Sequence, residues 1–211
     1  VPIIPNIVGP ASVCLGSTTN YSFTEPLFPG GSYDWSLSAP ALGNITVNTP
    51  NSFSIKWNTP GVDTVRLHLQ STCIDTILRF VVTVNALPVL TATNNGPVCE
   101  GGTVNLSASG AVSYIWSGPN SFAATTQNTS KSNLQVSDSG TYTVKGTGAN
   151  GCRDDVSTSV AVKPLPASTI TSASDAFCTG GSLLLNANTG SGLTYVWRKD
   201  GSNISGATCF Y

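Results

Sequence analysis

Short runs of alternating apolar and polar residues recur along the chain. In one run Phe53, Ile55 and Trp57 alternate with polar residues, and in another Val104, Leu106 and Ala108 do so. A period of two places every second side chain on the same face of a β-strand, so each run predicts a strand with one buried face. No stretch of ten or more residues carries a 3.6-residue apolar period with caps, so helices are not expected. The pattern predicts an all-β protein.

The strand pattern repeats. Cys14, Cys99 and Cys178 are 85 and 79 residues apart, and an alternating run begins five residues after each of them. Each run is followed by an aromatic pair at positions i and i+2, whose two rings share one strand face: Tyr33 and Trp35, Tyr114 and Trp116, Tyr195 and Trp197. The cysteines and the aromatic pairs together predict three similar units.

A second set of anchors supports the repeat. Gly61 precedes Cys73 by 12 residues, and Gly140 precedes Cys152 by the same 12. Equal spacing at two independent anchors indicates a true internal repeat rather than a shared bias in composition. Several short strands in each unit of about 80 residues, separated by Gly- and Pro-containing turns, predict β-sandwiches.

Proline-containing joins at 86–88 and 163–166 predict the domain boundaries. We expect a sandwich over residues 1–86, a second over 87–165 and a partial third over 166–211. The third is expected to be truncated, because the counterpart of Gly140 would fall near position 221 while the sequence ends at Tyr211. The short joins favour a semi-rigid, rod-like series of units.

Composition excludes several function classes. Charged residues make up 9% of the chain and the net charge is -1, so no basic field exists to bind nucleic acid. No apolar run reaches the roughly 18 to 20 residues that a membrane-spanning helix needs. The single histidine, His68, occupies an outward position in an alternating run, and no nucleophile or orienting acid can be assigned to it. We therefore expect neither an enzyme nor a cofactor.

Six cysteines in a chain this polar indicate an oxidising compartment outside the cytoplasm. With two cysteines in each complete unit, their number suggests one disulfide inside each repeat, Cys14 with Cys73 and Cys99 with Cys152. Such bonds would add roughly 4 kcal/mol each in the chain-entropy model. In a standard sandwich, however, the two positions lie at opposite ends, beyond bridging range. Pairing between neighbouring repeats is the alternative, and the partners of Cys178 and Cys209 stay open.

The second repeat resembles a bacterial immunoglobulin-like (Ig-like) domain, with residues 100–106 before Trp116 and residues 138–144 after it. The latter stretch is similar to the tyrosine corner of immunoglobulin folds, in which the hydroxyl group of Tyr142 would bond to the preceding turn. Ala108 and Val144 occupy the places of the usual inter-sheet cysteines. The first repeat, with Asp63 where Tyr142 would align, is closer to PKD-type domains through residues 54–65.

Together the units resemble the tandem PKD and Ig-like repeats of large secreted surface proteins of Bacteroidota. The resemblance implies a cell-surface location, export by the type IX secretion route and a role in adhesion or gliding. Asp63-Thr64-Val65 and Asp75-Thr76-Ile77 resemble the short O-glycan acceptor motif of those bacteria, which makes Thr64 and Thr76 candidate sites. Such glycans would protect edge strands in a chain with few lysines.

The aromatic side chains have two interpretations. Trp35, Trp116, Trp197 and Tyr142 recur in register with the buried pattern, which favours core anchors over a platform for stacking sugars. Phe122 lies in a polar loop and has no obvious core position, so it is the candidate for a binding loop.

One acidic pair could contribute to a metal site. Asp154 and Asp155 could help bind Ca²⁺, but adjacent strand residues point to opposite faces and no calcium loop accompanies them. No metal site is therefore expected.

These observations favour an extracellular structural or adhesive segment of a bacterial surface protein, acting as a rod-like spacer or as a module of a fibre. Its expected partners are the neighbouring repeats, other proteins of the surface or secretion system, and glycans. A carbohydrate- or protein-binding module and an accessory domain of a secreted enzyme are the alternatives.

Overall fold

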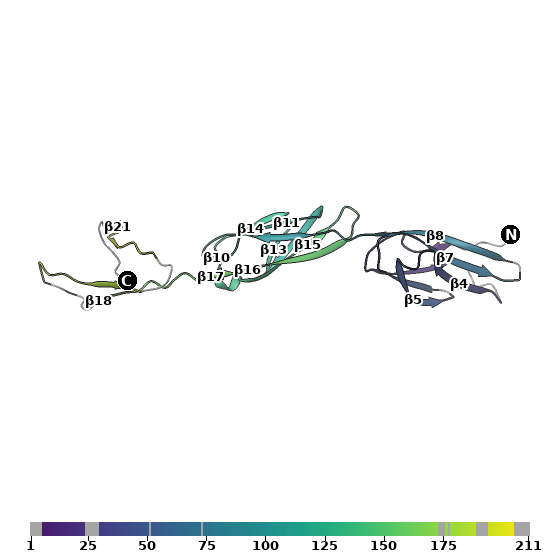
Figure 1. Ribbon diagram of the computed structural model, residues 1–211, viewed down its shortest axis with the longest axis horizontal. Coiled ribbons are helices and arrows are strands. Elements are labelled where there is room, and N and C mark those ends of the chain that lie inside the picture. Colours follow the sequence, from purple (N-terminus) through teal and green to yellow (C-terminus); the bar gives the residue numbers. More distant parts are fainter. Residues whose placement is uncertain are drawn as a thin grey trace. The chain divides into compact units, whose positions relative to one another are not determined.

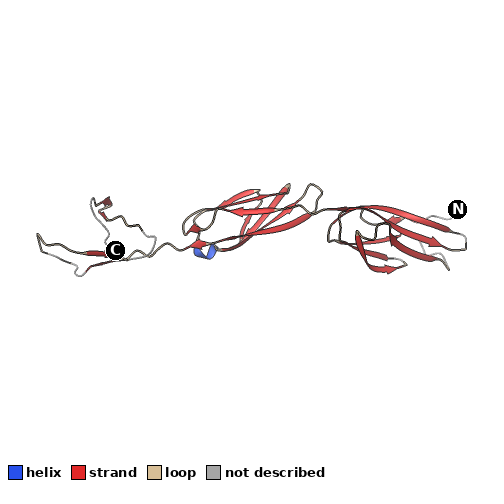
Figure 2. Cartoon of the chain, in the orientation of Figure 1, coloured by secondary structure: helices blue, strands red, loops and turns tan. Residues whose placement is uncertain are grey.

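The computed structural model describes residues 6–23, 30–50, 52–72, 74–172, 176, 178–188 and 194–204. Two compact units divide the chain, one over 1–164 and the other over 165–211, and each is described by itself. In the described residues the only helix is a single 3₁₀ turn, Val136–Asp138, and the remaining regular structure is β (Figure 2). None of the described helical structure is long and apolar enough to cross a membrane.

The first repeat folds as a sandwich of two four-stranded sheets (Figure 1). One sheet has the order β1 (Ile7–Val8), β3 (Thr18–Phe23), β6 (Ser52–Trp57), β5 (Gly43–Thr49). The other has the order β2 (Ser12–Cys14), β8 (Asp75–Asn85), β7 (Gly61–Gln70), β4 (Ser32–Leu37). In immunoglobulin lettering these sheets are A-B-E-D and A′-G-F-C, the constant-type arrangement with a divided first strand.

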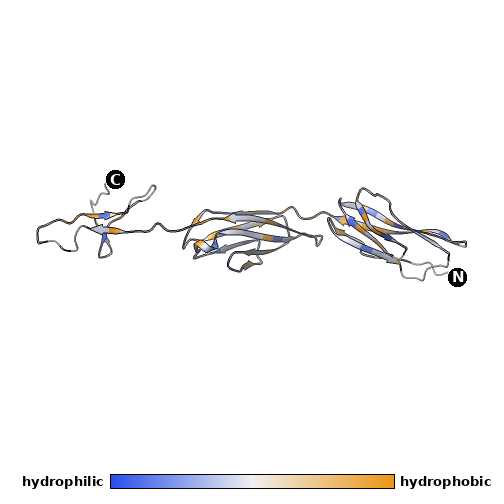
Figure 3. Cartoon of the chain, turned by 90° about the horizontal axis from the view of Figure 1, so that it is seen from below, coloured by the Kyte–Doolittle hydropathy of each residue, from blue (hydrophilic) through white to orange (hydrophobic). Residues whose placement is uncertain are grey.

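The core of the first sandwich forms where the alternating runs of both sheets face each other. Phe53, Ile55 and Trp57 on β6 are fully buried, as the period-two pattern predicts. Trp35 on β4 stacks on Phe53 with 5.4 Å between the ring centroids. Hydrophobic and hydrophilic positions alternate along the strands in Figure 3. The prediction of a strand with one buried face is therefore confirmed in this repeat.

The second repeat has a related arrangement. One sheet has the order β14 (Asn128–Lys131), β11 (Val104–Ser109), β9 (Thr91–Asn94). The other has the order β13 (Phe122–Ala124), β12 (Ser113–Gly118), β15 (Gly140–Thr147), β16 (Arg153–Val160). A short strand, β10 (Val98–Cys99), runs parallel to β17 (Val162–Lys163) as A′ beside the end of G. In immunoglobulin lettering the three-stranded sheet is E-B-A and the four-stranded sheet is C′-C-F-G.

The core of the second sandwich surrounds Trp116. Trp116 and Tyr142 are fully buried, and Ala108 and Val144, which stand where many immunoglobulin domains have cysteines, belong to the same cluster. This cluster shares no residue with the core of the first repeat. Each of the two repeats therefore buries its own apolar set.

The unit over 165–211 contains two short antiparallel pairs in its described residues. They are β18 (Ile170–Ser172) with β19 (Leu185–Ala187), and β20 (Arg198–Lys199) with β21 (Ser202–Asn203). None of its described residues belongs to a buried hydrophobic cluster, and Trp197 is only half-buried. In its described residues the chain is thus all-β, with two immunoglobulin-like sandwiches followed by a unit that contains two short strand pairs.

Candidate functional site

A disulfide joins the first repeat to the second. Cys14, the last residue of β2, bonds to Cys152, which precedes β16, and their Cα atoms are 5.6 Å apart. Cys152 is fully buried. The expectation of Cys14 paired with Cys73 and Cys99 with Cys152 is therefore wrong, and the alternative of pairing between neighbouring repeats is correct. Cys99 and Cys178 are exposed free cysteines, while Cys73 and Cys209 lie outside the described residues.

Strand geometry explains why Cys14 does not pair within its own repeat. Cys14 lies beside Asn85, at the C-terminal end of β8, whereas the hairpin that precedes β8 ends at Asp75. The ten-residue interval from Asp75 to Asn85 corresponds to about 33 Å of extended strand. Cysteines bridge only when their Cα atoms are within about 7 Å. The hairpin between F and G of the same repeat is therefore out of reach.

Chain connectivity brings the hairpin of the next repeat close instead. The chain leaves β8 at Asn85 and enters β9 at Thr91 after a short linker. Thr91 pairs with Ser109 at the end of the sandwich where the hairpin between β15 and β16 also lies. The exit from one sandwich and the F–G hairpin of the following one thus meet, and the disulfide closes across this junction.

A side chain of the hairpin adds a second tie to the junction. The Nδ2 group of Asn150 donates to the backbone oxygen of Ala86 at 2.9 Å, and Asn150 Oδ1 accepts from the backbone N–H of Cys152 at 3.1 Å. Asn150 therefore bonds both to the linker and to the cysteine that anchors it. The junction combines one covalent and one polar contact.

A shallow groove of about 500 Å³ is lined by linker residues 86–90, by Leu15 and by residues 154–156. Its only charged groups are the carboxylates of Asp154 and Asp155. Asp154 Oδ1 accepts from the backbone N–H of Asp155, and the described residues hold no group of three side chains suited to a metal ion. The groove therefore carries no argument for a metal.

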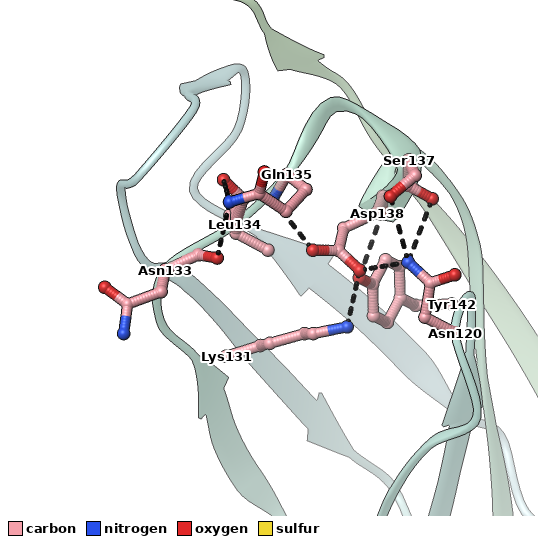
Figure 4. A network of polar contacts seen from close by, with 8 residues as sticks. All are labelled: Asn120, Lys131, Asn133, Leu134, Gln135, Ser137, Asp138 and Tyr142. Atoms are coloured by element: carbon pink, nitrogen blue, oxygen red, sulfur yellow. Dashed lines mark hydrogen bonds and ion pairs between the residues drawn. The ribbon is translucent and has the colours of Figure 1, made fainter.

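A second structured site lies around Asp138, at the turn before β15 (Figure 4). The hydroxyl group of Tyr142 donates to the backbone oxygen of Asp138 at 3.1 Å, which is the bond of a tyrosine corner. The Asp138 carboxylate accepts from Lys131 Nζ at 2.6 Å, Asn120 Nδ2 at 2.6 Å and the backbone N–H of Gln135 at 2.9 Å. These contacts tie three separate segments to one buried acid.

The contacts of Asp138 stabilise its charged form. Its side chain is 5% exposed, and hydrogen bonds from Lys131, then from the Gln135 backbone and Asn120, lower its pKa from 3.8 to about 2. A carboxyl whose pKa is depressed on folding contributes stability above its unfolded pKa and loses it as the pH falls towards the folded pKa. A shift of this size corresponds to roughly 2 kcal/mol.

We therefore expect the second sandwich to lose roughly 2 kcal/mol of unfolding free energy between about pH 5 and pH 2 through Asp138 alone. Urea unfolding across this range, followed by hydrogen exchange of the β15 amides, measures the change. Asp138→Asn should flatten the dependence, and Asp155→Asn, at an exposed position, should leave it in place. An unchanged slope in Asp138→Asn would contradict the assignment.

Phe122 belongs to this site rather than to an open loop. It lies in β13 and packs edge-on against Tyr142 with 5.3 Å between the ring centroids, and Lys131 Nζ lies 5.9 Å from its ring centroid. Phe122 also contacts the hydrophobic core. The expectation that it lacks a core position is therefore wrong, and the proposed binding loop loses the observation that motivated it.

The first repeat uses Asp63 at the position that aligns with Tyr142. Asp63 is buried, and its Oδ1 accepts from Ser38 Oγ at 2.6 Å, the Ala39 N–H at 2.9 Å and the Thr64 N–H at 2.6 Å. The carboxylate thus fastens the loop after β4 to β7, where the second repeat uses a phenol. Sequence reasoning noted this substitution but did not assign these contacts.

The remaining candidates lie on strands of the first repeat. His68 Nε2 lies 2.7 Å from Asp75 Oδ1, an exposed pair on β7 and β8 that sequence reasoning did not find. Thr64 and Thr76 are half-buried on the same two strands. Of the tryptophan anchors, Trp35 and Trp116 are buried, whereas Trp197 is half-buried.

No protein-family model matches the chain, and no curated protein matches it either. Solved structures with a similar fold include an ICAM-5 D1–D4 ectodomain fragment, with 16% identity, a TM-score of 0.45, and coverage of 77% of this chain and 48% of that one. A C-terminal 282-residue fragment of intimin, in complex with the intimin-binding domain of its translocated receptor, has 15% identity, a TM-score of 0.43, and coverage of 80% and 66%. The titin I-band fragment I67–I69 has 14% identity, a TM-score of 0.37, and coverage of 98% and 83%.

Proposed function

We propose that this chain is an extracellular structural segment of a large bacterial surface protein, in which disulfide-linked Ig-like units act as a spacer or fibre module. The observation that carries the proposal is the Cys14–Cys152 disulfide, because it joins successive units rather than the two sheets of one unit. A disulfide also supports an oxidising location outside the cytoplasm. The module boundaries proposed are 1–86, 87–165 and 166–211.

The linkage has a direct mechanical consequence. When tension acts on residues before Cys14 and after Cys152, it passes across the disulfide and bypasses the 138-residue separation between the two cysteines. Most strands of both sandwiches lie inside that loop. A spacer built in this way resists extension even if its sandwiches are only marginally stable, which suits a segment that holds another domain away from a cell.

The resemblance of the sequence to Bacteroidota surface repeats supports a finer proposal. The first unit would be PKD-like and the second Ig-like, the protein would leave by type IX secretion, and it would serve adhesion or gliding. Thr64 and Thr76 remain proposed O-glycan sites. Intact-mass measurement of the protein from its own cells, with and without chemical removal of O-glycans, would test the last point.

Small-angle X-ray scattering of the oxidised chain tests the spacer proposal. We expect an elongated particle, because each repeat has its own core and the repeats are joined by short linkers. A compact particle with one continuous core would contradict the proposal. On a glycan array, saturable binding that is abolished by changes in loop 117–122 would favour the binding-module alternative instead.

A further inference from the structure

The cysteines at 14, 99 and 178 occupy the same kind of backbone turn. In each turn the cysteine oxygen accepts from the N–H three residues later, in Ser17, Gly102 and Gly181, at 3.1, 2.9 and 2.8 Å. The glycine two residues after each cysteine has a positive φ, of 82°, 79° and 83° in turn. A positive φ at the third position of a turn is the requirement that glycine meets in type II turns. In all three repeats, therefore, the cysteine is the first residue of the same type of turn.

The surroundings of Cys14 and Cys99 also match bond for bond. The residue after each cysteine donates to the end of the last strand: Leu15 to Asn85 at 2.9 Å and Glu100 to Lys163 at 2.8 Å. The next residue donates to Trp57, the last residue of β6, in the first repeat (Gly16, 2.8 Å), and to Leu134, three residues after β14, in the second (Gly101, 2.7 Å). Both cysteines thus stand where the chain leaves their sandwich.

The two cysteines differ in their bonding. Cys14 is bonded to the F–G hairpin of the following repeat, whereas Cys99 is an exposed free cysteine. Cys152, in the F–G hairpin of Cys99's own repeat, is already bonded, and the ten-residue interval from Arg153 to Lys163, which spans β16 and β17, separates it from Cys99 by about 33 Å. Cys99 therefore has the position of a junction cysteine without its partner.

We propose that Cys99 forms a disulfide with the F–G hairpin cysteine of an Ig-like unit that follows the second repeat. The expected partner lies 12 residues after that unit's counterpart of Gly140, by the spacing shared by Gly61–Cys73 and Gly140–Cys152. The described residues of 165–211 contain no strand pair corresponding to β15 and β16. This inference rests on the proposed spacer function for its role. Its structural basis is the equivalent position of Cys14 and Cys99 in the two repeats.

The bond forms by oxidation of two thiols. Two protons and two electrons leave, and the electrons reduce the disulfide of an extracytoplasmic thiol–disulfide oxidoreductase to its dithiol form. The new covalent loop would begin at Cys99, inside the loop from Cys14 to Cys152. Because the two loops overlap, each junction between successive repeats would be covalently cross-linked. Cys178 lies in the same kind of turn, so it could form the corresponding disulfide at the next junction.

Disulfide mapping of the native protein, isolated at full length from its own cells, tests this inference. Free thiols are blocked with iodoacetamide and the protein is digested with pepsin at low pH, where disulfides do not exchange. We expect the Cys99 peptide linked to a peptide from the F–G hairpin of the following unit. Cys99 recovered as an alkylated thiol, or linked to Cys73, Cys178 or Cys209, would overturn the proposal.

A duplicated repeat provides a test that uses this chain alone. A copy of residues 87–164, carrying Cys99→Ser, is inserted between Pro164 and Leu165 of the full chain, so that Cys99 precedes a complete unit. Cys99 should then link to the copy of Cys152, and replacing that copied cysteine by serine should restore alkylation of Cys99. The Cys14–Cys152 peptide reports correct folding in both variants. Cys99 left free beside a formed Cys14–Cys152 bond would contradict the inference.

Discussion

Stretched from its two ends, the oxidised chain should extend by about 450 to 500 Å less than the reduced chain. The estimate is the 138-residue separation of Cys14 and Cys152 multiplied by about 3.3 to 3.6 Å per extended residue. The physical reason is that the disulfide carries the load and leaves the enclosed residues unstretched. Single-molecule force spectroscopy with handles at both termini, with and without a reductant, measures the difference.

Cysteine variants separate this effect from other consequences of reduction. Cys14→Ser should extend as far as the reduced chain even without a reductant, because it removes one of the two bonded cysteines. Cys99→Ser is the matched control, since its position in the repeat is the same and its thiol is free. It should leave the shortened extension unchanged. Equal extension of oxidised and reduced wild type would show that the two repeats are not covalently joined.

Asp138→Ala should destabilise the second sandwich by roughly 3 kcal/mol, the lower end of the cost of removing one partner from a buried ion pair. The change leaves the Gln135 N–H and Asn120 without the carboxylate and removes the partner of Lys131, whose side chain is 22% exposed. Because Lys131 is partly exposed, its ammonium group can turn towards water in the variant. The loss of unfolding free energy is therefore expected at the lower end of the range for breaking a buried ion pair. Urea unfolding with hydrogen exchange on β15 measures it.

Asp155→Ala provides the control for the Asp138 variant. Asp155 is an acid on β16, and its exposed position predicts a change within about 0.5 kcal/mol. Comparable losses in the two variants would mean that the three hydrogen bonds to Asp138 contribute no more than a surface charge. That outcome would contradict the role assigned to the network.

Alternation and spacing were sufficient to predict the strands and the aromatic core of the first two repeats, but no described residue of the third joins a buried core. The run of Phe53, Ile55 and Trp57 is fully buried, because a half-buried strand needs an apolar residue at every second position and the sequence supplies it. The bond from Tyr142 to the turn before it was implied by the resemblance of residues 138–144 to a tyrosine corner, and it is present. These features depend on local order along the chain, which is why a single sequence contains them.

The disulfide pairing could not be decided by the number of cysteines in each repeat. Two per unit fit both a bond inside the unit and a bond to the next one. The deciding quantity is the length of β8, which separates Cys14 from the hairpin of its own repeat. Strand length and parallel register are properties of the folded sandwich, so the sequence indicated the geometric difficulty without resolving it.

The Asp138 network was missed for a related reason. Lys131 and Asn120 precede Asp138 by 7 and 18 residues, and the three residues belong to different elements and turns, so no single helix or strand relates their side chains. Phe122 was misinterpreted because β13 has only three residues, too few to show alternation. Contacts made by a short edge strand and a turn depend on how the sheets pack, and no local pattern encodes them.

Disulfide mapping of the purified, unreduced chain tests the central claim most directly. A peptide containing Cys14 should be recovered bonded to a peptide containing Cys152, which would establish the covalent link between successive Ig-like repeats. Recovery of Cys14 bonded to Cys73, together with Cys99 bonded to Cys152, would contradict the account and return each disulfide to the interior of a single repeat.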